Sequence, residues 1–159
     1  MIQGAPVAAD SRIESKFPSG FMSPPRMHPL ADAVTLRILI AEDNRDSAGS
    51  LKMLLQGLGY DVHVVNDGES AVRAAAIIRP QVILMDIAMP GMDGYEAARR
   101  IRAQSPDMKV RIVALTGLGQ QIDRLHSAEA GIDHHLVKPL DLAVLQPILG
   151  FTWKPGAVV

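Results

Sequence analysis

The stretch Val82-Ile83-Leu84-Met85-Asp86-Ile87-Ala88-Met89-Pro90-Gly91-Met92-Asp93-Gly94 decides how the rest of the chain is interpreted. Four apolar residues lead directly to a carboxylate, and a loop rich in proline and glycine follows. An unbroken apolar run bounded by turn residues is typical of a strand buried on both faces, as in parallel sheets. Asp86 is therefore predicted to lie where a buried strand ends, and an acid there needs a cation or a partner to compensate its charge.

The composition excludes several classes of protein. The chain has 159 residues, 48% of them hydrophobic, which is enough for one domain with a substantial core. A net charge of −1 gives no indication of nucleic acid or an anionic membrane as a partner. The absence of cysteine excludes disulfides, thiol catalysis and thiolate metal sites. With no signal peptide and no apolar run of membrane-spanning length, we expect a soluble cytoplasmic protein.

The two ends of the chain differ from its middle. Residues 1–33 contain five prolines and follow neither a helical nor a strand period, so they are interpreted as a flexible leader. Regular patterning begins near Leu36 and predicts one domain over residues 34–150. Residues 151–159 are interpreted as a tail that is too short to form an output domain.

The hydrophobic pattern of the middle predicts five strands that alternate with five helices. The strands are expected at residues 38–41, 62–65, 82–86, 111–115 and 134–137. The first four helices are expected at about residues 48–58, 71–78, 95–101 and 120–130, and a last one begins near Asp141 and is cut short by Pro147 and Gly150. This alternation predicts right-handed βαβ units in a doubly wound α/β fold, with helices on both faces of a parallel sheet.

The order of the strands follows from their composition. The first, third and fourth strands are the most apolar, so they belong inside the sheet. The second and fifth carry His63, His134 and His135, which suits edge strands. This agrees with the flavodoxin-like order 2-1-3-4-5.

Polar residues directly follow four of the five strands, and these four are neighbours in that order. They are Glu42 and Asp43 after the first strand, Asp86 after the third, Thr116 after the fourth and Lys138 after the fifth. The carboxyl ends of parallel strands share one edge of the sheet, so these side chains are expected to meet there. The second strand is followed by Asn66 and Asp67, which are interpreted as a helix cap.

Three carboxylates in one place require a cation, because like charges a few ångströms apart repel strongly. Oxygen ligands without suitable Cys or His spacing favour Mg²⁺. Asp43 and Asp86 are the direct candidates and Glu42 is expected to act through water, although Asp43 or Asn44 is also expected to cap the first helix. Lys138 and Thr116 look suited to a phosphoryl group beside the metal, and a carboxylate can act as nucleophile toward phosphorus. Asp86 is the best placed for this role.

Several motifs together resemble the receiver domain of two-component response regulators, over about residues 36–149. They are Glu42-Asp43, the segment from Met85 to Gly94, Ala114-Leu115-Thr116 and Val137-Lys138-Pro139. The resemblance implies phosphorylation of Asp86 by a sensor or hybrid histidine kinase, or by a histidine-containing phosphotransfer protein. It further implies Mg²⁺ held by Glu42, Asp43, Asp86 and the Ala88 carbonyl, phosphoryl binding by Lys138, a switch hydroxyl on Thr116, and a cis Lys138–Pro139 bond. The expected role is a phosphoacceptor switch that acts through a downstream protein target and is not an enzyme.

The chain also departs from the pattern of this family. An aromatic switch residue often lies three places before the lysine, and His135 stands there instead. Ala88 and Leu118 occupy two positions beside the phosphoryl group that often carry polar side chains, so slow self-hydrolysis is expected. The shortened last helix puts the usual dimer face, built from the fourth helix onward, in question.

Two other functions compete with the switch. The first is a Mg²⁺-dependent phosphohydrolase with Asp86 as nucleophile, but phosphatases of the haloacid dehalogenase type have a second acid two residues later, where this chain has Ala88. The second is a scaffold domain that is never phosphorylated. Arg99, Arg100 and Arg102 are interpreted as a solvated helix face.

Overall fold

A five-stranded parallel sheet forms the centre of the computed structural model, which describes residues 35–117 and 124–150. The leader and the tail expected at residues 1–33 and 151–159 lie outside the described residues. The strands are β1 (Arg37–Ala41), β2 (Asp61–Val65), β3 (Val82–Asp86), β4 (Arg111–Thr116) and β5 (His134–Val137). The sheet has the order β2-β1-β3-β4-β5 with every neighbouring pair parallel, so the predicted order is confirmed.

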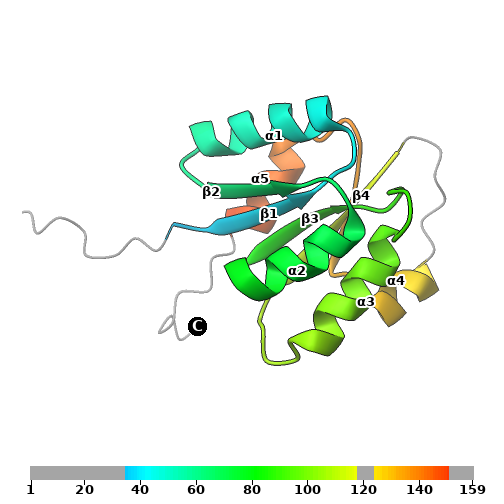
Figure 1. The fold of residues 1–159 in the computed structure, drawn as a ribbon. Coiled ribbons are helices and arrows are strands. Elements are labelled where there is room, and N and C mark those ends of the chain that lie inside the picture. Colours follow the sequence, from blue (N-terminus) through cyan, green and yellow to red (C-terminus); the bar gives the residue numbers. More distant parts are fainter. Residues whose placement is uncertain (1–34, 118–123, 151–159) are drawn as a thin grey trace, which may run out of the picture. The chain divides into compact units, whose positions relative to one another are not determined.

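Helices cover both faces of the sheet, as expected for a doubly wound fold (Figure 1). One face carries α1 (Arg45–Gly57) and α5 (Leu142–Gly150). The other carries α2 (Gly68–Ile78), α3 (Gly94–Gln104) and α4 (Arg124–Ala130). Among the described residues, no helix is long and apolar enough to cross a membrane.

Successive side chains along each strand point to opposite faces of the sheet, so a separate core forms on each face. In β3, Val82 and Leu84 pack toward α1 and α5, whereas Ile83 and Met85 pack toward α2 and α3. All five residues of β3 are buried, while the edge strands β2 and β5 each have exposed or half-buried positions, among them the three histidines. The apolar run around Asp86 is thus the innermost strand of the sheet.

Side-chain caps fix where the first three helices begin. Asn44 caps α1 by accepting hydrogen bonds from the backbone N–H groups of Asp46 and Ser47. Asp67 and Asp93 cap α2 and α3 in the same way. Of the two candidates for the first cap, Asn44 takes the role, which leaves the Asp43 side chain outside the cap.

The expectation that Pro147 interrupts the last helix is wrong, because α5 continues through Pro147 to Gly150. Proline in this place removes one hydrogen bond to the Ala143 carbonyl and crowds it. Leu145 and Leu149 are 0% and 1% exposed on the same helix, and their burial favours the helix across the proline. Residues 118–123, including Leu118 and the start of the expected fourth helix, lie outside the described residues.

The expectation that Arg102 belongs to a solvated helix face is wrong, because its guanidinium makes structural contacts. It donates to the Gly131 and Val110 carbonyls and to Asp133 Oδ2, each from an Nη atom at 2.8 Å. Asp133 Oδ2 also accepts from the Ile112 N–H at 2.7 Å. The end of α3 is thereby joined to the start of β4 and to the turn after α4.

Candidate functional site

The predicted polar residues occupy the carboxyl edge of the sheet, where four neighbouring strands end. Glu42 and Asp43 directly follow β1, Asp86 and Thr116 are the last residues of β3 and β4, and Lys138 directly follows β5. The register places Asp86 beside Leu115 of β4, and the Lys138 N–H donates to the Thr116 carbonyl at 2.8 Å. The backbone alone therefore brings these residues to one short stretch of the edge.

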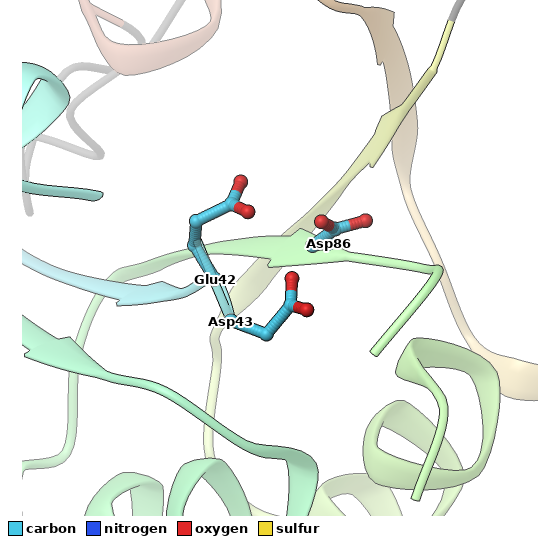
Figure 2. A group of neighbouring side chains, drawn as sticks. All are labelled: Glu42, Asp43 and Asp86. Atoms are coloured by element: carbon cyan, nitrogen blue, oxygen red, sulfur yellow. The ribbon is translucent and has the colours of Figure 1, made fainter. Parts of the chain in front are cut away.

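Three carboxylates gather at this edge (Figure 2). One carboxylate oxygen from each of Glu42, Asp43 and Asp86 lies within 4.8 Å of the others, and the described part of the chain holds no second group of this kind. Glu42 and Asp86 are 3% and 5% exposed, whereas Asp43 is exposed. An all-oxygen donor set that is open on one side fits Mg²⁺, which keeps several waters and binds through one or two carboxylates.

Lys138 compensates the two buried acids. Its Nζ lies 2.6 Å from Asp86 Oδ2 and also donates to Glu42 Oε2. Burial raises the pKa of the Glu42 carboxyl above its ordinary value, and the Asp86 charge adds to this, against the lowering effect of the Lys138 hydrogen bond. Burial lowers the pKa of Lys138, but hydrogen bonds to Asp86 and Glu42 outweigh it, so the pKa is raised and the ammonium keeps its charge.

The loop after β3 holds the Asp86 side chain in place. The Ala88 N–H donates to Asp86 Oδ1 at 2.9 Å, and Ala88 itself is exposed. Gly94 begins α3 directly against this loop, where a Cβ would lie 2.4 Å from the Asp86 carbonyl oxygen. The Lys138–Pro139 bond is cis, as the family resemblance implied.

Asn66 is a site residue that the sequence reasoning missed. It was interpreted as part of a helix cap, but only Asp67 has that role, and Asn66 Nδ2 donates to the Glu42 carbonyl at 2.9 Å. Asn66 follows β2, which pairs with β1, so a polar residue after this strand also reaches the edge. A residue after the second strand, expected only to cap a helix, therefore helps to position Glu42.

Thr116 and His135 lie on the side of the site nearest β5. Thr116 is 3% exposed, and its hydroxyl donates to the Leu136 carbonyl over 3.4 Å, a long hydrogen bond. His135 Nε2 lies 2.8 Å from Ser127 Oγ on α4. The sequence reasoning did not single out Ser127, because a serine within a helical pattern gives no local signal of a partner in a strand.

A family model described as the response regulator receiver domain matches residues 38–149. The DNA-binding response regulator MtrA of Mycobacterium bovis is 36% identical over 108 residues, which are 68% of this chain and 46% of MtrA. The chain thus spans less than half the length of the curated relatives it matches.

Two solved structures extend the comparison. The receiver domain of the sensor histidine kinase PA1611 from Pseudomonas aeruginosa, with a magnesium ion coordinated in its active-site cleft, is 43% identical with a TM-score of 0.65, covering 72% of this chain and 94% of that one. The Saccharomyces cerevisiae receiver domain of Ssk1, solved with the histidine phosphotransfer protein Ypd1, is 27% identical with a TM-score of 0.66, covering 72% of this chain and 86% of the matched one.

Proposed function

The chain belongs to the response regulator receiver domain family of two-component systems, and we propose that Asp86 is its phosphoacceptor. The family acts as a phosphoacceptor switch and not as a classical enzyme, and phosphorylation and Mg²⁺ binding are typical of it. The observation that supports Asp86 is the convergence of two further acids and one ammonium on its carboxylate at the carboxyl edge of the sheet.

Asp43 and Asp86 would hold Mg²⁺ directly, and Glu42 and the Ala88 carbonyl would complete its surroundings. The exposed Asp43 supplies an open ligand, while the buried Glu42 is already engaged by Lys138, which supports contact through water. When bound, the ion would neutralise the crowded carboxylates and the charge of the transferred group. The single exposed and two buried acids fit a site that faces solvent on one side.

The chemistry assigned to the protein's own residues is a phosphoryl transfer from a phosphohistidine. A carboxylate oxygen of Asp86 forms the new bond to phosphorus as the phosphorus–nitrogen bond breaks, and the electron pair of that bond leaves with the imidazole ring. The Ala88 N–H holds Asp86 Oδ1 in place. As negative charge moves from the carboxylate to the phosphoryl group, the Lys138 ammonium leaves Asp86 Oδ2 and pairs with a phosphoryl oxygen.

The switch that follows is assigned to Thr116, whose present hydrogen bond is long and therefore easily exchanged. Its hydroxyl would turn to the phosphoryl group, and His135 would act as the switch ring in the adjacent strand. The phosphorylated chain would then favour a second arrangement of α4 and β5 that a downstream protein recognises.

The expected partner is a cytoplasmic protein that carries a phosphohistidine: a sensor or hybrid kinase, or a phosphotransfer protein. A groove of about 280 Å³ lies beside Glu42 and Lys138, lined by α1 and the loop after β5. Leu54 of the groove is 43% exposed. A partly apolar groove beside Lys138, which contacts Asp86, suits a protein donor. The expectation that the protein acts without an output domain stays a prediction.

A small phosphodonor tests the proposal. The purified chain is incubated with acetyl phosphate and Mg²⁺, and the intact mass is measured. We expect wild type and the control Asp107→Ala, an exposed loop acid, to gain one phosphoryl group, whereas Asp86→Ala or a chelator abolishes the gain. Wild type without a phosphoryl group would support the scaffold, and repeated hydrolysis of a phosphate ester would support the phosphohydrolase.

The phosphorylated form is expected to last longer than seconds, because the exposed, apolar side chain of Ala88 cannot orient a water for hydrolysis.

A further inference from the structure

The hydrogen bond between Ser127 and His135 is a polar contact inside the packing of α4 against the sheet. Ser127 Oγ lies 2.8 Å from His135 Nε2, and Ser127 is only 4% exposed. Ser127 belongs to α4 and His135 to β5, so the bond joins the two elements that the proposed switch would move.

The register of the sheet places the ring next to the switch hydroxyl. Thr116 pairs with Val137, and Ala114 pairs with His135, so Thr116 and His135 are diagonal neighbours on the same face. Leu136 packs with the core on the opposite face, beneath α1 and α5, which confirms that the His135 side chain points toward α4. A change in the position of the Thr116 side chain therefore changes the space beside the ring.

We infer that Ser127 is a positioning residue that holds the His135 ring against α4, and that the ring must leave Ser127 when Thr116 turns toward a phosphoryl group. This inference rests on the proposed function. A serine hydroxyl can donate to Nε2 or accept from Nε2–H, so the bond forms with either tautomer of the ring and with its protonated form.

The consequence for phosphoryl binding follows from linkage. The Ser127–His135 bond stabilises the arrangement in which Thr116 donates to Leu136, and it opposes the arrangement in which Thr116 binds the phosphoryl group. The Ser127–His135 bond and phosphoryl binding are two equilibria that share this conformational change, so each changes the other by the same factor. Removal of the Ser127 hydroxyl should thus raise the affinity of the chain for a phosphoryl mimic, by about fivefold for one net hydrogen bond.

The test measures binding of beryllofluoride with Mg²⁺ to the full chain and its variants. Ser127→Ala should bind the mimic about fivefold more tightly than wild type, while Ser127→Thr, which keeps the hydroxyl, should return toward the wild-type affinity. Ser105→Ala, after the far end of α3, controls for a serine-to-alanine change elsewhere and should leave the affinity unaltered. Equal or weaker binding by Ser127→Ala would overturn the inference.

A second measurement follows the His135 ring directly in wild type, with Ser127→Ala as the reference. The ¹⁵N resonance of His135 Nε2 reports its hydrogen bond, and it should shift on saturation with beryllofluoride toward the value that Ser127→Ala shows without the mimic. An unchanged resonance at saturation would show that the ring keeps its bond to Ser127, and the inference would be wrong. Failure of wild type to bind the mimic at all would instead overturn the proposed function of Asp86.

Discussion

Replacement of Lys138 by methionine should expose the electrostatic balance of the site. The substitution keeps most of the length of the side chain and removes its charge. Two carboxylates, from Glu42 and Asp86, would then lie at the edge of the sheet without their shared ammonium, and their side chains are only 4% and 8% exposed. We expect Lys138→Met to be less stable than wild type in the presence of a chelator.

The magnitude follows from the burial of the three groups. Removal of one partner of a fully buried ion pair costs about 3–5 kcal/mol, because a buried charge is left uncompensated. The Lys138 side chain is 29% exposed, so in the variant water can partly solvate the two carboxylates in place of the ammonium. We therefore expect a loss of about 2–3 kcal/mol in the free energy of unfolding. For a domain of this size, that corresponds to a fall of roughly 10 °C in Tm.

The assay is thermal unfolding with and without Mg²⁺. A divalent cation that binds the folded chain raises its Tm, and the ammonium competes with that cation for Glu42 and Asp86. Mg²⁺ should thus raise the Tm of Lys138→Met by more than that of wild type. Lys52→Met, on α1, is the matched control and should change the free energy of unfolding by less than about 0.5 kcal/mol. Equal Tm values in chelator, or equal gains with Mg²⁺, would refute the reasoning.

Three further substitutions test separate parts of the structure. Because burial raises the pKa of Glu42, the Glu42 carboxyl binds its proton more tightly in the folded chain than in the unfolded chain. The free energy of unfolding therefore falls as pH rises from the ordinary pKa of the carboxyl through its pKa in the folded chain. Glu42→Gln should flatten this fall, which urea midpoints measured against pH will show. Arg102→Ala should lower the free energy of unfolding by about 2–3 kcal/mol in urea titrations, whereas Arg99→Ala, on the exposed face of the same helix, should have a smaller effect. Gly94→Ala should destabilise by about 1–3 kcal/mol, because its Cβ would meet the Asp86 carbonyl; an unchanged midpoint would contradict the close packing seen there.

Much of the fold was predictable because its signals are local. The apolar run that ends at Asp86 identifies an inner strand, and the histidines of β2 and β5 identify the edges. Parallel pairing then makes the residue after each strand a neighbour of the others, so the meeting of Glu42, Asp43, Asp86 and Lys138 follows from topology alone.

The rest depends on contacts between distant residues. Arg102 resembles its neighbours on α3 in sequence, yet its partners Gly131 and Asp133 lie 29 and 31 residues further along. Ser127 is likewise defined by a ring on β5, which no spacing rule within α4 indicates. Pro147 is tolerated because of the leucines that its helix buries, and the local rule for proline carries no information about them.

The chemical nature of the phosphorylated bond tests the central claim most directly. Wild type labelled by acetyl phosphate and Mg²⁺ is divided, one half is treated with hydroxylamine, and both halves are digested and mapped by mass spectrometry. We expect hydroxylamine to cleave a mixed anhydride on Asp86, so that the hydroxamate appears on the peptide that contains Asp86 and on no other. A label that survives hydroxylamine, or a hydroxamate at another acid, would contradict it.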